Sequence, residues 1–325
     1  MIEPLIESAE KPVAHIKRNP ADFVVREDLG FAPAGSGEHV FYLVRKEGCN
    51  TVDVARALAD ALEVSTGDIG YAGRKDRHAI TEQWFSAVTD QDVWPCSLPG
   101  VECLRSARHT RKLRRGQHRG NQFVLRLRET NADAELQLRA LSAGFPNYFG
   151  AQRLSPSNVE QALEWLAQQH LGPDRTSRRR RKPARDGRRG WQLSVLRSML
   201  FNAVVAARVA RGNADQPIAG DVLVDDVATG PLWGRGRSDA SGLALEIEQE
   251  ALQDYADVCA SLEYSGLNQD RRAIWVVPEN LQIQTVESGV VELSFALPAG
   301  AYATSMLEHV VNVVDDSATL AGRAA

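Results

Sequence analysis

The sequence of 325 residues is short of the features that identify several common protein classes. It has only four cysteines, Cys49, Cys96, Cys103 and Cys259, and none forms a CxxC pair. We therefore expect buried free thiols rather than a disulfide framework or a zinc site. The seven histidines form no HxxxH or HxH cluster, so metal-dependent hydrolysis is unsupported and we expect no bound metal.

Long apolar runs and targeting signals are also missing. No apolar stretch approaches the ~20 residues that a membrane-spanning helix needs. The N-terminus MIEPLIESAEKP is acidic and lacks the regions of a signal peptide. We therefore expect a cytoplasmic protein with no membrane attachment.

Nucleotide and hydrolase motifs are incomplete. The glycine-rich segment 234–242 lacks both the Walker Gly-Lys-Ser/Thr and the dinucleotide spacing, so we interpret it as a flexible loop. There is no Gly-x-Ser-x-Gly nucleophile elbow.

The pattern of the chain favours an α+β fold, because strand-like and helix-like segments mix without regular βαβ order. The strand-like segments are 23–25, 40–44, 69–72, 84–88, 122–128, 220–226, 228–234, 273–277 and 290–297. The helix-like segments are 51–62, 133–141, 159–169, 193–209 and a closing 302–314. The turn residues at 146–150 mark a boundary between domains.

The charge is unevenly distributed. The formal net charge of −4 argues, as an average, against binding to nucleic acid. Yet residues 105–128 carry +9 and residues 175–189 carry +8, which leaves −21 for the rest. Such segregation favours a polyanionic partner that is steered to one face. The run 175–189 is also typical of a solvated loop.

Residues 105–128 lead from an Arg-rich loop into a strand that begins with Asn121 and Phe123. A basic track beside an amide and an aromatic ring suits one flipped base, with phosphates on arginine and the base on the ring. An ordinary buried strand aromatic is the alternative interpretation of Phe123.

A second cluster surrounds Asp76, which lies among Arg74, Lys75 and Arg77. Nearby cations lower the pKa of a carboxylate, so Asp76 is expected to stay ionised, as a nucleophile or base must. On charge pattern alone, a solvated surface pair is the alternative.

At these residues the chain resembles the TruD family of tRNA pseudouridine synthases, in order and over nearly its whole length. The matching motifs are DFVVRE at 22–27, GEH at 37–39, KEGCNT at 46–51, GRKDRHAITEQ at 73–83, KLRRG at 112–116, GNQF at 120–123, PNYFGAQR at 146–153, LRSMLFN at 196–202, TGPLWGR at 229–235 and LPAGAYATS at 297–305.

The resemblance implies a pseudouridine-synthase catalytic domain with a central, mostly antiparallel sheet, interrupted by an inserted α/β domain. The catalytic domain would span 1–146 and 277–325, and the insertion 147–276. The resemblance makes Asp76 the catalytic aspartate. It makes Phe123 the ring that stacks on the uracil, and it gives the positions that contact the nucleoside or lie near the site as Phe23, Asn121, Tyr302 and Lys17. Position 302 departs from the family, where phenylalanine is expected, and the added hydroxyl needs water or a partner if it is buried.

The implied activity is isomerisation of uridine, at position 13 in the D-arm of certain tRNAs, without a cofactor. Asp76 could attack C1′, attack C6 or abstract a sugar proton, and the sequence does not choose among these routes. The expected partner is tRNA, and the protein is expected to be a monomer. The residues expected to hold the RNA backbone are Arg111, Lys112, Arg114, Arg115, Arg179, Arg180, Arg181 and Lys182.

Two other functions stay open at this point. One is a non-catalytic tRNA-binding or RNA-chaperone protein on the same fold, against which the intact Asp76 cluster argues. The other is a different base enzyme, such as a nucleoside glycosylase with an aspartate nucleophile.

Overall fold

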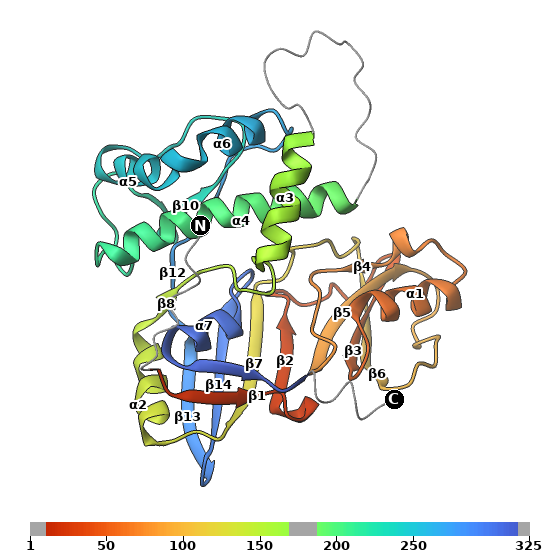
Figure 1. Cartoon of the computed structure of the whole chain (residues 1–325). Helices are drawn as coiled ribbons and strands as arrows, with labels where there is room; N and C mark the ends of the chain where they lie inside the picture. Colours follow the sequence, from red (N-terminus) through yellow and green to blue (C-terminus); the bar gives the residue numbers. More distant parts are fainter. Residues whose placement is uncertain (1–10, 169–186, 318–325) are drawn as a thin grey trace, which may run out of the picture. The chain divides into compact units, whose positions relative to one another are not determined.

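The computed structural model describes residues 11–168 and 187–317, and they form two compact units (Figure 1). The sheet unit contains the described residues of 7–142, 278–303 and 310–325. The helical unit contains the described residues of 143–277 together with 304–309. The grouping of 304–309 with the helical unit has no counterpart in the predicted division. Which part is the catalytic domain and which the insertion stays a prediction.

The sheet unit is built on one ten-stranded sheet with the central order β13-β14-β7-β2-β5-β3-β6. Its strands are β1 (Val13–Ile16), β2 (Phe23–Asp28), β3 (His39–Lys46), β4 (Gly70–Tyr71), β5 (Ile80–Val88), β6 (Val101–His109), β7 (Gly120–Arg128), β13 (Glu279–Glu287), β14 (Val290–Pro298) and β15 (Asn312–Asp315). The pairs β2–β5 and β1–β15 are parallel and the other pairs are antiparallel. The predicted α+β class, with a mostly antiparallel central sheet, is therefore confirmed.

Helix α1 (Thr51–Ala61) covers part of this sheet and confirms the helix predicted at 51–62. Its apolar stripe, which includes Val54 and Leu58, packs on β3 and β5 residues such as Tyr42 and Phe85. Asn50 begins the helix with a capping box, since its side chain and that of Asp53 satisfy each other's backbone N–H groups. The unit also contains α2 (Ala132–Ala140) and the short 3-10 helices η1 (Pro20–Asp22) and η2 (Thr66–Asp68), while η3 (Leu141–Ala143) lies at its edge.

Two predictions about the sheet unit are wrong. The predicted closing helix 302–314 ends early, as α7 (Ala303–Val310), and the chain continues as strand β15. The β-branched run there suits a strand, and its pairing with β1 supplies the backbone partners. The Arg-rich segment from Arg105 to His109 is part of strand β6 rather than a loop. Strand β6 pairs with β3 at the end of the central strand order and has no buried residue, so it lacks the alternation that identifies strands.

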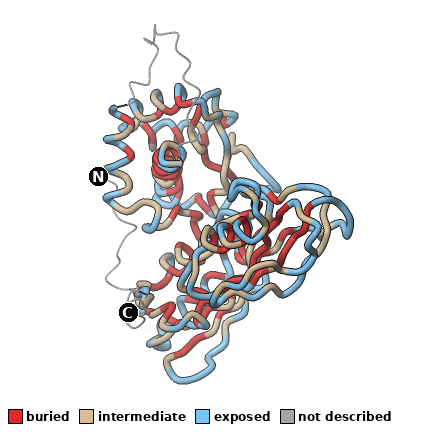
Figure 2. Tube along the Cα trace, turned by 90° about the vertical axis from the view of Figure 1, so that its right-hand side faces the viewer, coloured by how far each residue is buried: buried red, intermediate tan, exposed pale blue. Residues whose placement is uncertain are grey.

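The helical unit has a core on helix α4 (Gly187–Ala210), which extends the helix predicted at 193–209. Figure 2 shows buried residues concentrated inside each unit. The helical unit also contains the helices α3 (Pro156–Gln168), α5 (Gly242–Leu252), η4 (Gln253–Tyr255) and α6 (Ala256–Glu263). Its strands form the sheet β11-β10-β9 (Asp270–Ala273, Val227–Leu232, Val222–Val224) and the two-stranded pair of β8 (Phe145–Pro146) with β12 (Trp275–Val276).

By length and composition alone, residues 188–210 of α4 could also cross a membrane, which differs from the expectation that no stretch comes close. Over half of its most apolar 18-residue window is buried inside the protein. Leu196, Met199, Leu200 and Val204 belong to one core cluster with residues of α3 and α6. The structure thus uses α4 as a core helix, for which the same apolar character is needed.

Candidate active site

Polar side chains gather on one face of the central strands, where a sheet normally packs apolar residues. Strand register sets Glu27 of β2 opposite Asn121 of β7, and Lys46 of β3 opposite Thr81 of β5. Glu27, Lys46 and Thr81 are all buried. Because buried polar groups need partners, their presence indicates a polar structure above the sheet.

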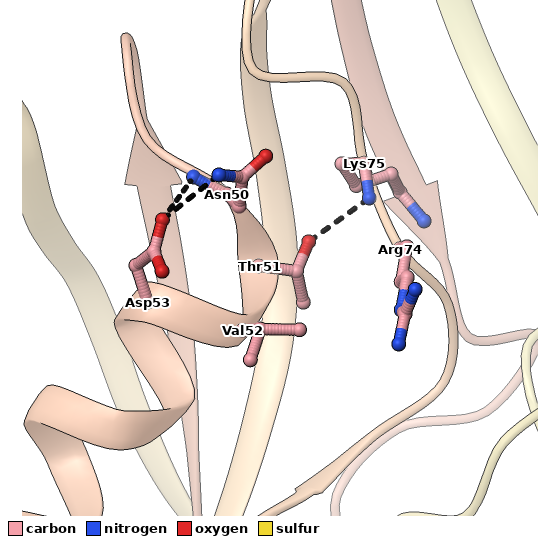
Figure 3. Close-up of a pocket in the computed structure, with 6 residues that line it drawn as sticks. All are labelled: Asn50, Thr51, Val52, Asp53, Arg74 and Lys75. Carbon is pink, nitrogen blue, oxygen red and sulfur yellow. Dashed lines mark hydrogen bonds between the residues drawn. The ribbon is translucent and has the colours of Figure 1, made fainter. Parts of the chain in front are cut away.

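That structure is the loop 72–79, which joins β4 to β5 and carries Asp76. Gln83 of β5 donates to the carbonyl of Gly73 at 3.1 Å. The hydroxyl of Thr51, at the start of α1, donates to Gln83 at 2.8 Å and accepts the backbone N–H of Lys75 at 2.9 Å (Figure 3). Two elements of the fold thus hold the loop in place through its backbone.

Lys46 of β3 holds the same loop through hydrogen bonds to its backbone carbonyls. Its side chain is fully buried, and Nζ donates to the carbonyls of Cys49 at 2.9 Å, Asp76 at 2.8 Å and Lys75 at 3.5 Å. Burial lowers the pKa of Lys46 to about 8. The three carbonyls match the three donors of the charged ammonium, so the charged form is the one that this geometry serves.

Lys75 is anchored through its side chain as well. Its Nζ lies 2.8 Å from Oε2 of Glu27, in an ion pair that is nearly excluded from solvent. The other carboxylate oxygen of Glu27 accepts the backbone N–H of Trp84 at 3.0 Å. The residue next to Asp76 is thereby tied to the centre of the sheet.

Asp76 itself remains partly open, with 31% of its side chain exposed. Its Oδ2 accepts from Nζ of Lys17 at 2.6 Å, and its Oδ1 accepts the backbone N–H of His78 at 2.9 Å. Burial works to raise the pKa of Asp76, but the hydrogen bond and charge of Lys17 and the N–H of His78 outweigh it, so the pKa lies below its usual value. The carboxylate is ionised at neutral pH.

The cation that acts on Asp76 is therefore Lys17, and not its sequence neighbours. Arg77 donates through Nε to the carbonyl of Gly48 at 2.9 Å, and Lys75 pairs with Glu27. Burial works to lower the pKa of Lys17, but Asp76 and Asp315 together raise it. The expected ionised state of Asp76 thus has a different source from the local charge cluster.

A series of aromatic contacts begins at the Lys17 ammonium and includes rings of neighbouring strands. This ammonium lies 5.0 Å from the ring centroid of Phe23, and Phe23 meets Phe123 edge to face at 6.4 Å. Phe123 in turn stacks on Phe295 at 5.2 Å and is 7% exposed. These contacts give Phe123 the core packing of the alternative interpretation, and its stacking on a base stays a prediction.

Asn121 lies on the same strand as Phe123, one pleat away and on the same face. Its Oδ1 is buried and has no hydrogen-bond partner among the described residues. A hollow of about 50 Å³ beside it is lined by residues that include Arg119 and Leu297. An unpaired acceptor of this kind is a candidate for a ligand's donor.

Tyr302 lies immediately before α7 and is partly buried. The structure brings Lys17, Phe23 and Phe123 into one set of contacts with Asp76, whereas the role of Tyr302 rests on the resemblance alone.

The basic track has two kinds of members. Arg111 and Arg114 are exposed, and their guanidinium groups have no partner among the described residues. Lys112 donates to the carbonyl of Gly67 at 2.5 Å, and Arg115 lies on Tyr71, with 5.5 Å to the ring and 3.2 Å to its hydroxyl. The second predicted set, Arg179, Arg180, Arg181 and Lys182, lies outside the described residues.

A cavity of about 280 Å³ adjoins the loop (Figure 3). It is lined by Asn50–Asp53 at the start of α1 and by Arg74 and Lys75. Arg74, which lies two residues before Asp76 in the sequence, is exposed.

The described residues contain no group of three or more His, Cys, Asp or Glu side chains that could hold a metal ion. The four cysteines are free thiols, of which Cys259 is buried and the other three are partly exposed. The expectation of burial thus holds fully for Cys259 only.

Sequence reasoning did not assign the residues that anchor the loop, namely Glu27, Lys46, Thr51 and Gln83. A signal was available for two of them. In β3, alternate residues from Val40 to Lys46 point inward, so a lysine at an inward position of an apolar strand predicts a buried charge. The same alternation from Phe23 places Glu27 inward in β2.

Comparisons of sequence agree with the motifs. A family model described as "tRNA pseudouridine synthase D (TruD)" matches residues 2–157. A protein of Aeromonas hydrophila subsp. hydrophila named tRNA pseudouridine synthase D is 40% identical over 96% of this chain and 95% of its own. Proteins with the same name from Aeromonas salmonicida and Cellvibrio japonicus are 41% and 40% identical, over 91% and 95% of this chain and 90% and 92% of their own.

A comparison of structures gives the same fold. The crystal structure of a putative tRNA pseudouridine synthase D (TruD) from Methanosarcina mazei matches with a TM-score of 0.62 and 20% identity. The match covers 92% of this chain and 94% of that one.

Proposed function

Because the chain belongs to the TruD family of tRNA pseudouridine synthases, we propose that it isomerises uridine to pseudouridine in tRNA, with the Asp76 carboxylate as its catalytic group. The observation that carries the proposal is the state of Asp76. Its carboxylate is kept ionised by Lys17 and is partly open to solvent. The loop that carries it is held by backbone hydrogen bonds to Lys46 and Thr51. A reacting group needs this combination of charge, access and fixed position.

The chemistry fits a single carboxylate. Isomerisation breaks the C1′–N1 bond of uridine and forms a C1′–C5 bond, so no atom is gained by the base and no electron changes hands. Attack at C1′, attack at C6 and removal of a sugar proton all begin from an ionised carboxylate, and all three routes place Asp76 in the same role.

The target nucleoside has to leave the RNA stack to reach Asp76. We assign Phe23, Phe123 and Tyr302 as aromatic contacts of that nucleoside and Asn121 as a polar contact. The support is the contact chain from Asp76 through Lys17 and Phe23 to Phe123, and the unpaired Oδ1 of Asn121. Lys17 sets the charge of Asp76.

The finer parts of the proposal follow from the family resemblance. The target is uridine 13 in the D-arm of certain tRNAs, and the phosphates lie along the track that includes Arg111 and Arg114. We also propose that the protein acts in the cytoplasm, as a monomer and without a cofactor.

The test is incubation with unmodified tRNA transcripts that contain 5-tritiated uridine. Bond formation at C5 releases the tritium, and mapping of pseudouridine identifies the site. We expect release from the wild type and, for Asp76→Asn, a loss of roughly 10³-fold or more, at the upper end of what one acid–base group contributes, with tRNA binding largely kept. The matched control is Asp68→Asn, which alters an exposed aspartate just before β4 and should keep full turnover.

Other outcomes would identify other functions. Full turnover by Asp76→Asn would contradict the catalytic assignment. Binding of tRNA by the wild type without tritium release would indicate the non-catalytic RNA-binding protein. Free uracil in place of pseudouridine would indicate a glycosylase.

A further inference from the structure

The ammonium of Lys17 bonds two carboxylates rather than one. Its Nζ lies 2.6 Å from Oδ2 of Asp76 and 2.9 Å from Oδ2 of Asp315. The lysine side chain is 8% exposed, while that of Asp315 is 42% exposed. Asp315 is therefore a second, more accessible partner of the residue that ionises Asp76.

The fold places Asp315 there through pairing of the two ends of the described chain. Strand β15 runs parallel to β1, with Asp315 in register with Ile16, the residue before Lys17 (Figure 1). Lys17 has a φ of +55°, a left-handed conformation that is uncommon outside glycine and that ends the strand. The strand pairing and this turn of the backbone bring the two side chains together.

The carboxylate of Asp315 is itself oriented. Its Oδ1 accepts the backbone N–H of Ser317 at 2.9 Å, which leaves Oδ2 for Lys17. The next residue, Asp316, has a separate set of partners, because it bonds His15 at 3.0 Å and Arg18 at 3.0 Å. The two neighbouring aspartates thus have different partners: Asp315 bonds Lys17, whereas Asp316 bonds His15 and Arg18.

Electrostatics give the two carboxylates opposite effects on Asp76. The charged groups around Asp76 include Lys17 just after β1, Lys46 from β3, Asp315 from β15, and Lys75 in the loop with its partner Glu27 from β2. The loop also carries Arg74 and Arg77, which are exposed. Lys17 lowers the pKa of Asp76, whereas the negative charge of Asp315 raises it. Asp315 therefore weakens the hold of Lys17 on Asp76 and also keeps that lysine charged.

We propose that Asp315 is a positioning residue that retains the Lys17 ammonium beside the reaction centre while Asp76 exchanges its bond to Lys17 for contact with the target nucleoside. The proposal rests on the proposed function. Without Asp315, Lys17 would have Asp76 as its only carboxylate partner among the described residues, and release of the reacting oxygen would break the only ion pair of a buried lysine. Such a step is costly, because a buried charge without a partner is strongly unfavourable.

The test compares Asp315→Asn, Asp315→Glu and the matched control Asp316→Asn in tRNA pseudouridylation under single-turnover conditions. We expect Asp315→Asn to lower the rate about tenfold, which is less than for a fully buried pair because Asp315 is 42% exposed, with the half-saturating tRNA concentration changed less than twofold. Asp315→Glu should recover most of the rate. Asp316→Asn should behave as the wild type, because the carboxylates that bond the Lys17 ammonium are those of Asp76 and Asp315, whereas Asp316 bonds His15 and Arg18.

A second measurement does not depend on activity. Carboxyl NMR titration of ¹³C-labelled aspartate, with Asp76 assigned from the Asp76→Asn spectrum, reports the pKa of Asp76 in the free protein. Asp315→Asn should lower that pKa, so the acidic limb of the rate profile should move to lower pH. Asp316→Asn should leave both unchanged.

The outcomes separate this proposal from the function on which it rests. Equal rates and equal Asp76 titrations in Asp315→Asn and Asp316→Asn would overturn the role of Asp315. A reduced rate in Asp315→Asn with an unshifted Asp76 titration and no recovery in Asp315→Glu would also overturn it, in favour of a purely structural role. A wild-type protein that makes no pseudouridine would contradict the proposed function, while the titration would still decide whether Asp315 acts on Asp76.

Discussion

Both units of the molecule bury charged pairs, but the two sets described next differ in whether they adjoin a partly exposed carboxylate. In the helical unit, Arg208 and Asp221 are each 2% exposed and lie 2.7 Å apart. Arg208 also donates to the backbone carbonyls of Asn213 and Gln216, and Asp221 accepts the N–H of Ile218. Every charged atom of the pair is turned toward protein, which is the arrangement of a structural ion pair.

In the sheet unit the buried charges lie around the loop 72–79, which carries the partly exposed carboxylate of Asp76. Lys46 is fully buried and Lys75 is paired with a buried glutamate, yet Asp76 keeps 31% of its side chain exposed. Buried charge alone therefore does not identify an active site. The distinguishing feature is a set of buried charges that leaves one reactive group with room for another partner.

The sharpest test of this comparison is Arg208→Met in the helical unit. Loss of the guanidinium leaves Asp221 buried without a cation, which is expected to lower the free energy of unfolding by roughly 3–5 kcal/mol. Urea denaturation monitored by circular dichroism measures the loss. The rate of pseudouridine formation per folded molecule should be unchanged, and a strong fall in that rate in a stably folded sample would contradict the division of roles.

The counterpart in the sheet unit is Lys46→Met, which removes the donor to two carbonyls of the Asp76 loop and to that of Cys49. Small displacements of a reacting group cost about 100-fold in rate, and we expect a loss of that size in kcat with little change in KM. The matched control is Arg45→Met, since Arg45 is exposed and points to the opposite face of the same strand. Equal kcat values for the two variants would remove Lys46 from the site.

The same lysine predicts an alkaline limit to activity. Its pKa of about 8 means that the amine becomes neutral as pH rises through that value, and a neutral amine has too few donors for its three carbonyl partners. The rate should be full well below pH 8 and fall roughly tenfold by one unit above it, as the protonated fraction does. The residual rate of Lys46→Met should not show this limb, and a limb of the same position in that variant would assign the titration to another group.

The sheet unit also shows how far sequence reasoning reaches. Helix α1 and the central strands were predictable because their apolar patterns are local and regular. Strand β15 was not, since its partner β1 lies about 300 residues away in sequence and its own run also fits a helix. Edge strands such as β6 and β13 were missed because neither has a buried residue, so their sequences lack the alternation of apolar and polar positions.

In the candidate active site too, residues with a local sequence signal were predictable and long-range contacts were not. Asp76 stood out by its motif, and Lys17 was reached only through the family resemblance. The contact of Lys17 with Asp315 depends on a left-handed residue and on a long-range strand pair, neither of which has a local signature. The buried glutamate and lysine on strands β2 and β3 were readable in principle from alternation, once the inward face was known.

The smallest expected effect concerns the affinity for tRNA. Its salt dependence shows which basic segment contacts the phosphates. Arg111→Ala and Arg114→Ala remove exposed guanidinium groups that bond no other group among the described residues. Each should therefore lower the salt dependence of tRNA affinity by about 0.7–0.9 in log–log slope. Lys112→Ala should change the slope less, because its ammonium already bonds the carbonyl of Gly67.

The matched comparison is joint neutralisation of Arg179, Arg180, Arg181 and Lys182, the run that belongs to the other basic segment. If both segments contact phosphate, the two sets of substitutions should lower the slope additively. The kcat at saturating tRNA should stay unchanged, because phosphate contacts act on the binding of the RNA rather than on the reacting carboxylate. Filter binding at several salt concentrations measures the slopes. An unchanged slope after neutralising 179–182 would leave the track of the sheet unit as the phosphate contact and make the second run a solvated segment, whereas an unchanged slope for Arg111→Ala and Arg114→Ala would reverse that conclusion.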